Sequence, residues 1–465
     1  MESDVCLALG KTEHASSGEE EKPYPKWLLV AYLAHLLLPL ALLLDCCAAW
    51  RLHSQQFSDE ILCAISAAWL AAAIGILLLA RDRARLLKRM RGPVAGLFAL
   101  CITIAVFELA LRATMGEARP ALWTPGLRTT YKMDTRLMPG ASPDVTFTVN
   151  RLGLRGPEMP SDKRVYKIVA VGGSTTECLV LTDAKTWPQR LMDELNHSQQ
   201  DVPVWVGNAG AAGHTASHHL ELLRDLPVLS QADALVFMIG INDLEATLVQ
   251  RGGPADNYIW KDVRELRDRL AGEPEYRYPL FRHLYLFRLI RNASLNFWLI
   301  THYKIHEDDE AGMRERRARF RRVPLPDLAL GLREYRVRLE KIAQECGTRH
   351  LRCIFLSQPS MWRSGLPPQE EALLVFGWVG RLGDPWGYLT VDDGERALDQ
   401  FNQVELDVCR EMGMECLDVA AMVPKDSTAF YDDVHFNEGG AEIVGHAVAS
   451  YLLSRPPFRS QSLPH

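Results

Sequence analysis

The sequence predicts an α/β protein in which about five parallel strands lie between two layers of helices, with three transmembrane helices in front of this domain. Two observations predict this arrangement. Three long apolar runs lie within the first 113 residues. Between residues 165 and 455, short β-branched or apolar runs alternate with amphipathic helical patterns. Such an alternation is typical of an open parallel sheet with helices on both faces.

The composition excludes several classes of protein. Of the 465 residues, 48% are hydrophobic and 24% are charged, which excludes collagen-like and largely disordered chains. The 52 basic residues are balanced by 58 acidic ones, for a net charge of -6. This balance offers no global electrostatic attraction for nucleic acid, so no nucleic-acid partner is expected.

The first quarter of the chain is predicted to be a membrane anchor. Residues 1–26 form a mostly polar tail, and the apolar runs cover 27–44, 61–80 and 92–113. Each run is close to the roughly 20 helical residues that cross a bilayer. Three buried helices of a soluble bundle are the alternative, but soluble helices rarely lack a polar face for this length. The anchor therefore spans 27–113, and the lipid bilayer is an expected partner.

The charges between the runs predict the orientation. The loop 81–91 carries six Lys and Arg residues against one Asp. By the positive-inside rule this loop is cytoplasmic, and so is the N-terminal tail. We therefore expect a multi-pass protein of the cell membrane, with everything after about residue 114 in the periplasmic or extracellular space.

The elements of the exported part follow from its apolar periodicity. Residues 114–150, rich in Pro, Gly and Thr, predict a linker with an extended end, and the domain proper covers 151–465. The expected strands are 167–171, 202–206, 234–239, 351–356 and 414–419, and the expected helices are 186–196, 217–226, 332–345, 398–412 and 439–453.

Residues 245–330 interrupt this alternation and predict a helical insertion. The insertion contains interleaved Arg and aromatic residues and the basic run 313–322, Met-Arg-Glu-Arg-Arg-Ala-Arg-Phe-Arg-Arg. One interpretation is a surface that lies on anionic lipid headgroups. The favoured interpretation is a helical cap whose charged face is solvated.

The cysteines of the exported part leave the disulfide pattern open. Five of them follow residue 114, so an oxidising compartment would leave at least one thiol unpaired within the chain. No Cys-x-x-Cys pair suggests zinc. The five are Cys178, Cys346, Cys353, Cys409 and Cys416.

Small and polar residues stand where an open parallel sheet binds its ligands. That place lies beyond the carboxyl ends of the strands, where the strand order reverses. Three segments follow predicted strands and a fourth precedes the last helix. They are 172–177 (Gly-Gly-Ser-Thr-Thr-Glu), 208–210 (Asn-Ala-Gly), 240–243 (Gly-Ile-Asn-Asp) and 432–435 (Asp-Asp-Val-His).

In this order, the four segments resemble those of the SGNH hydrolase superfamily, also called GDSL-like esterases. The lead-in at 149–158, Val-Asn-Arg-Leu-Gly-Leu-Arg-Gly-Pro-Glu, also resembles that of bacterial members. The resemblance implies a flavodoxin-like α/β/α fold, a serine nucleophile and no cofactor or metal. The residues it assigns are the nucleophile Ser174, the oxyanion donors Ser174, Gly210 and Asn242, and the Asp432–His435 pair.

The chemistry of these residues supports the same roles. A serine hydroxyl needs a base within hydrogen-bond reach, which His435 can supply. A carboxylate three residues earlier, Asp432, can fold back to the other ring nitrogen and set the tautomer. Asp433 is the rival for this position. The family motif has Asp before the serine where this chain has Gly173, which indicates a different subgroup.

Two further groups of residues, one of histidines and one of tryptophans, have both a structural and a functional interpretation. His214 and His218 would share one face of a helix next to His219, but no accompanying motif indicates metal binding. Trp362, Trp378 and Trp386 could line a sugar or acyl subsite, and core packing is an equal alternative.

The sequence thus predicts a membrane-anchored, extracytoplasmic serine esterase that cleaves O-acetyl or other short-chain esters through an acyl-enzyme. Its expected partners are an acylated small molecule, lipid or glycan. An acyltransferase that modifies a cell-surface glycan with the same site, helped by a membrane acyl donor, is the first alternative. The second is a catalytically silent glycan-binding or assembly module.

Overall fold

The computed structural model describes residue 67 and residues 102–111, 113, 121–123, 125–198, 202–249, 310–381 and 384–458. The described residues before 116 belong to one compact unit, and those from 121 onward to a second one. The two units are described separately.

The first unit contributes a short helical stretch. Residues 102–111 are helical, with exposed side chains at Val106 and Leu109. The predicted spans 27–44 and 61–80 lie outside the described residues, residue 67 excepted, as does much of 92–113. No helix in the described part of the chain is long and apolar enough to cross a membrane. The described residues thus give no support to the three predicted transmembrane helices.

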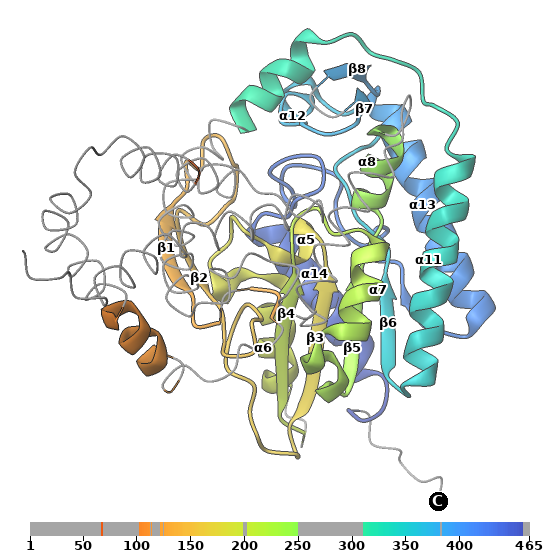
Figure 1. The fold of residues 1–465 in the computed structure, drawn as a ribbon. Coiled ribbons are helices and arrows are strands. Elements are labelled where there is room, and N and C mark those ends of the chain that lie inside the picture. Colours follow the sequence, from red (N-terminus) through yellow and green to blue (C-terminus); the bar gives the residue numbers. More distant parts are fainter. Residues whose placement is uncertain are drawn as a thin grey trace, which may run out of the picture. The chain divides into compact units, whose positions relative to one another are not determined.

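A five-stranded parallel sheet forms the middle of the second unit (Figure 1). Its strands are buried on both faces, which explains their nearly continuous apolar sequences. The strand order reverses on either side of β3, so the carboxyl end of β3 is the switch point of the sheet. In spatial order the strands are β4 (Val204–Gly210), β3 (Tyr166–Gly172), β5 (Ala234–Met238), β6 (Arg352–Leu356) and β9 (Glu415–Leu417).

Helices cover both faces of this sheet, as predicted. Strand β4 lies on one side of β3, and the later strands lie on the other side. Right-handed crossovers therefore place the helix between β3 and β4 on the opposite face of the sheet from the helices of the later connections. Helices α6 and α14 pack together, and α11 packs against both α7 and α13. The helices are α6 (Trp187–His197), α7 (Ala216–Asp225), α8 (Ile241–Val249), α11 (Ala329–Thr348), α13 (Val391–Met412) and α14 (Glu438–Leu453).

The segment predicted as a linker instead forms part of the domain. Strands β1 (Arg128–Lys132) and β2 (Asp144–Thr148) pair as an antiparallel hairpin. Phe147 and Met138 are buried in the hydrophobic core, and the Tyr131 hydroxyl donates to the Leu179 carbonyl at 2.5 Å. The linker prediction overlooked these core contacts because the apolar residues of 125–150 are sparse and separated by turn residues.

The inserted region is described only at its two ends. Residues 250–309 lie outside the described part, whereas 310–319 are helical. A second hairpin follows the short helix α12 (Pro368–Glu371), and it consists of β7 (Trp378–Arg381) and β8 (Asp384–Tyr388). The neighbouring basic run does not form a free basic surface, because several of its guanidinium groups bond to carbonyl groups within the domain. These are Arg314, Arg317, Arg321 and Arg322.

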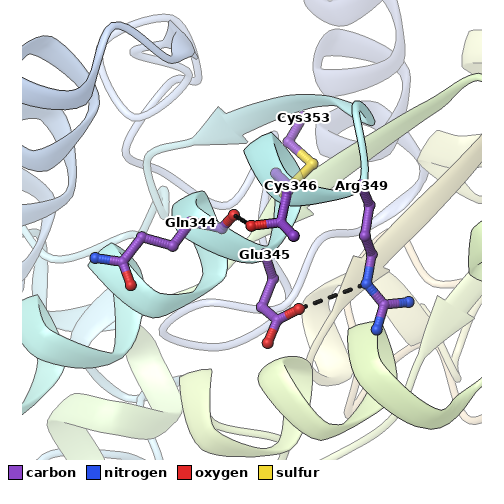
Figure 2. The surroundings of a disulfide bond; sticks show 6 residues. Gln344, Glu345, Cys346, Arg349 and Cys353 are labelled. Carbon is purple, nitrogen blue, oxygen red and sulfur yellow. Dashed lines mark hydrogen bonds and ion pairs between the residues drawn. A yellow bond between two sulfur atoms is a disulfide. The ribbon is translucent and has the colours of Figure 1, made fainter.

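Two disulfides join helices to the strands that follow them. Cys346 at the end of α11 pairs with Cys353 in β6, beside the Arg349–Glu345 ion pair (Figure 2). Cys409 in α13 pairs with Cys416 in β9. Both bonds bridge a separation of seven residues. Cys178 remains a free, buried thiol, and burial raises its pKa to about 12.

Candidate active site

Ser174 stands at the switch point of the sheet. Strand β3 ends at Gly172, Gly173 caps the next helix, and Ser174 is the first residue of that helix, α5 (Ser174–Glu177). A Cβ at Gly173 would lie 2.3 Å from the Asn242 side-chain nitrogen, so only glycine allows this approach. The sharp strand-to-helix turn therefore presents the serine hydroxyl beyond the strand end.

The structure brings the three predicted triad residues into one hydrogen-bonded chain. Ser174 Oγ lies 2.7 Å from His435 Nε2, across 261 residues of sequence. His435 Nδ1 lies 2.6 Å from Asp432 Oδ2. Because a carboxylate only accepts, Nδ1 carries the hydrogen and Nε2 is left to accept from the serine hydroxyl. This tautomer is the one that a serine nucleophile requires.

Neighbouring groups stabilise the ionised forms of both Asp432 and His435. Burial opposes ionisation of Asp432, but the His435 imidazole and the N–H groups of Val434 and His435 hold its pKa below the ordinary value. Burial also opposes the imidazolium form, yet the Asp432 carboxylate, with Glu310 and Asp433, raises the pKa of His435 above 6.5. Asp432 is 1% exposed and the His435 side chain 16%, so the base remains open to a substrate.

Asp433, the rival of Asp432, has a different environment. Its Oδ1 accepts from Trp362 Nε1 at 2.6 Å, and its Oδ2 accepts from the backbone N–H groups of Val375 and Phe376. The carboxylate thereby ties the loop after α12 to the turn that carries His435. Trp362 is buried by these contacts, which favours core packing over a subsite for this tryptophan.

The oxyanion role predicted for Gly210 does not fit the structure. Strand β4 continues to Gly210, which pairs with Gly172 and donates its N–H to Asn208 Oδ1 at 2.8 Å. A Cβ at Gly210 would lie 2.2 Å from the Glu177 nitrogen. The glycine therefore serves the close packing of α5 on β4, and its N–H is not available to an oxyanion. The error arose because β4 is four residues longer at this end than its apolar run predicts.

The turn after β4 offers another amide. Gly213 has a φ of +76°, and its N–H forms no hydrogen bond to any residue in the described part of the chain. The next carbonyl, that of His214, accepts from Asn242 Nδ2 at 3.0 Å, which holds this turn beside Gly173. The second N–H of the Asn242 amide remains available. The N–H of Ser174 also lies in the first turn of α5, where a helix supplies no acceptor.

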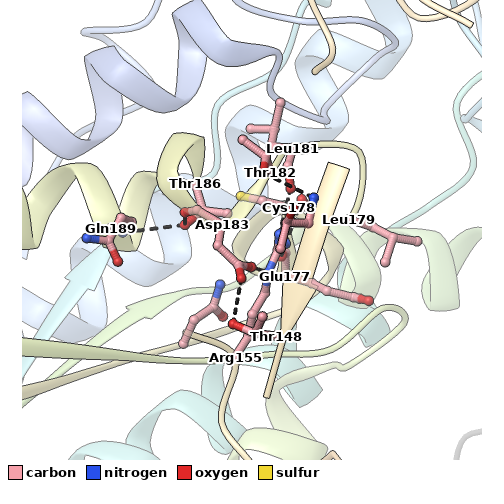
Figure 3. A network of polar contacts seen from close by, with 12 residues as sticks. Thr148, Arg155, Glu177, Cys178, Leu179, Leu181, Thr182, Asp183, Thr186 and Gln189 are labelled. Carbon is pink, nitrogen blue, oxygen red and sulfur yellow. Dashed lines mark hydrogen bonds and ion pairs between the residues drawn. The ribbon is translucent and has the colours of Figure 1, made fainter. Parts of the chain in front are cut away.

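A buried arginine that the sequence analysis did not assign bonds the end of α5 and the chain that follows it (Figure 3). Arg155, 1% exposed, donates to the carbonyl groups of Glu177, Cys178 and Leu181 and forms an ion pair with Asp183 at 2.8 Å. It therefore holds the chain that follows α5. The available signal was its place in the lead-in segment, since no local pattern marks an arginine that bonds residues more than 20 positions away.

The histidine cluster lies at the start of α7 and is buried. His218 caps α7 together with Thr215. His219 is fully buried, and desolvation lowers its pKa to about 3. Within the described residues, no group of three His, Cys, Asp or Glu side chains is placed to hold a metal ion.

A model of the GDSL-like lipase/acylhydrolase family matches residues 170–443, which is more than half of the chain. The chain belongs to this family. It is thereby a member of the SGNH hydrolase superfamily and an ester-hydrolysing serine hydrolase, as the sequence predicted. None of the curated proteins matches this chain.

Solved structures of GDSL-like enzymes resemble it at low identity. An acetylxylan esterase from Geobacillus stearothermophilus is 13% identical, with 61% of this chain and 93% of that chain covered and a TM-score of 0.33. A lipase/acylhydrolase from Enterococcus faecalis is 14% identical, with 62% and 96% covered and a TM-score of 0.32.

Proposed function

We propose that this protein is a membrane-anchored, extracytoplasmic esterase that removes O-acetyl or other short acyl groups from a small molecule, lipid or glycan, with Ser174 as nucleophile. The catalytic part of this proposal rests on the chain of hydrogen bonds from Ser174 to His435 (2.7 Å) and from His435 to Asp432 (2.6 Å). Family membership supplies the reaction class.

In the proposed mechanism His435 acts first as base and then as acid, both when the acyl-serine forms and when it is hydrolysed. His435 Nε2 takes the hydroxyl proton as Ser174 Oγ attacks the ester carbonyl, and Asp432 stabilises the imidazolium that forms. The imidazolium then protonates the leaving alcohol, which yields an acyl-serine. Water, deprotonated by His435, attacks this ester and releases the acid and the free serine.

The negative oxygen of the tetrahedral intermediate needs preorganised donors. We assign the N–H of Ser174, the free N–H of the Asn242 amide and the N–H of Gly213, in place of the occupied amide of Gly210. Loss of one such donor typically costs about 3 kcal/mol of barrier.

Aromatic side chains pack against the base. The rings of Tyr431 and Phe376 both lie 5.5 Å from the His435 ring, centroid to centroid. The Tyr431 ring stacks on the imidazole and the Phe376 ring is tilted against it. These contacts help to hold the imidazole in its place between Asp432 and Ser174.

Two lines of argument support the cellular placement. The three apolar runs and the basic loop 81–91 predict a multi-pass anchor with the domain outside. The two disulfides are typical of proteins that mature in an oxidising compartment and are rare in the cytosol.

The nucleophile is tested with the full-length chain in detergent. We expect wild-type protein to react with a fluorophosphonate and to hydrolyse p-nitrophenyl acetate, and Ser174→Ala to lose labelling and at least roughly 10⁴-fold in kcat. Because only neutral His435 can act as base, kcat/KM should rise with pH through a pKa above 6.5.

Ser454→Ala, an exposed serine beyond α14, is the matched control and should behave as wild type. Folded wild-type protein that neither labels nor hydrolyses would overturn the esterase proposal in favour of a binding role.

A further inference from the structure

A helix from the inserted region reaches the residues that carry the triad. Residues 310–319 form this helix beside the loop after α12 (Figure 1). Glu310 and Arg314 form an ion pair at 3.0 Å, one turn apart, with side chains that are 2% and 13% exposed. Burying an ion pair costs desolvation free energy, which additional hydrogen bonds must offset.

Arg314 holds three separate segments together. Its guanidinium donates to the carbonyl groups of Leu137 at 2.6 Å, Leu373 at 3.2 Å and Tyr431 at 3.1 Å. Tyr431 directly precedes Asp432, and its own N–H bonds the His435 carbonyl at 3.1 Å. Arg314 thus restrains one end of the turn that contains the acid and the base of the triad, and the Tyr431 N–H links this end to the other.

Glu310 adds a carboxyl group to the same neighbourhood. Burial and the nearby Asp432 charge raise its pKa to about 8, while Arg314 and His435 oppose the shift. The titratable groups that face His435 are Asp432 and Asp433 on its own turn, Glu310 on the inserted helix and Glu177 on α5.

We propose that Glu310 and Arg314 are positioning residues of this active site: Arg314 holds the Tyr431 carbonyl and thereby the Asp432–His435 turn, and Glu310 holds Arg314 in place. The proposal rests on the proposed esterase function. It assigns the inserted region a part in catalysis without contact with the substrate.

Two variants separate the two effects. Arg314→Lys keeps the charge but loses the planar fork that reaches three carbonyl groups. Glu310→Gln keeps an acceptor for Arg314 but removes the carboxyl charge. Glu315→Gln and Arg319→Lys are matched controls, because that ion pair lies on the same helix at the same spacing and is 61% and 73% exposed.

For Arg314→Lys we expect kcat for p-nitrophenyl acetate to fall about 10- to 100-fold, because catalysis is sensitive to small displacements, with KM within about two-fold of wild type. Hydrogen exchange of the peptide that contains residues 431–435 should be faster than in Arg319→Lys. Thermal unfolding of each variant shows whether it is folded.

For Glu310→Gln we expect kcat to fall about 2- to 10-fold, because a neutral amide oxygen holds the Arg314 guanidinium less firmly than the Glu310 carboxyl oxygen does. Hydrogen exchange of the peptide that contains residues 431–435 should be faster than in Glu315→Gln. Glu315→Gln should leave both kcat and exchange unchanged.

The proposal is overturned if folded Arg314→Lys matches its control in kcat and exchange, or if folded Glu310→Gln matches Glu315→Gln in both. The exchange measurements need no ester hydrolysis. An inactive wild type would therefore refute the esterase function and still leave the positioning roles measurable.

Discussion

Two adjacent aspartates of this enzyme have different roles because different groups face them. Asp432 accepts from His435 Nδ1 and two backbone N–H groups, which holds its pKa below the ordinary value. Burial and the Asp432 charge raise the pKa of Asp433 despite Arg317. Asp433 instead joins Trp362 and the loop around Val375 to the turn.

Amide substitution of each aspartate distinguishes these roles. We expect Asp432→Asn to lower kcat roughly 10³- to 10⁴-fold, because an asparagine amide favours the wrong histidine tautomer. Its melting temperature should also fall, because Asp432 Oδ1 accepts from two backbone N–H groups. Asp433→Asn should mainly lower the melting temperature, because one carboxylate oxygen that accepts two backbone N–H groups is weakened.

Initial rates and thermal unfolding of the two proteins, measured side by side, check this prediction. If Asp433→Asn lost as much kcat as Asp432→Asn while its melting temperature was unchanged, the assignment of the triad acid would be wrong.

Among elements, the packing of α5 on β4 decides where the nucleophile stands. Gly210 in β4 leaves no room for a side chain, since a Cβ there would meet backbone atoms of Thr176 and Glu177 at 2.2–2.7 Å. Arg155 holds the same end of α5 through the carbonyl groups of Glu177 and Cys178. The serine is therefore positioned by backbone packing as well as by the turn that carries it.

Gly210→Ala tests this contact. We expect a loss of about 1–3 kcal/mol in unfolding free energy from overpacking, together with a fall in kcat as α5 and Ser174 are displaced. Gly347→Ala in α11 is the control, because no atom lies within 4 Å of a Cβ there. Denaturant unfolding and initial rates measure both effects. A Gly210→Ala protein with wild-type stability and kcat would contradict this account.

For the whole molecule, the disulfides relate the fold to the compartment in which it forms. The Cys346–Cys353 and Cys409–Cys416 bonds fasten neighbouring helices, α11 and α13, to the adjacent strands β6 and β9. Each bond closes a short loop and contributes about 2 kcal/mol in the chain-entropy account. Such bonds are rare where thiols are kept reduced, which motivates the proposed extracytoplasmic placement.

The oxidation state of these cysteines in cells tests the extracytoplasmic placement. After rapid acid quenching and denaturation, we expect all four to resist alkylation until a reductant is added, whereas Cys178 is alkylated at once. Mass spectrometry of the cysteine peptides distinguishes the two groups. Alkylation of all four cysteines without reductant would refute the proposed placement.

The sequence predicted the elements and the two hydrogen bonds of the triad from local pattern. Apolar periodicity indicated the five strands of the central sheet, and the polar residues at their carboxyl ends indicated where Ser174 and His435 would meet. Asp432 bonds a histidine three residues away, so the spacing alone made it the better candidate than Asp433.

Other features depend on groups that are distant in sequence, and only the tertiary structure decided them. Asn208, within β4, occupies the Gly210 amide, so the predicted oxyanion donor was wrong. Arg155 and Arg314 bond carbonyl groups up to 177 residues away, and carbonyl groups carry no sequence signal. The disulfide pairing likewise required knowing which helix ends lie beside which strands. Local periodicity specifies an element, whereas the partner of a side chain depends on how the elements pack.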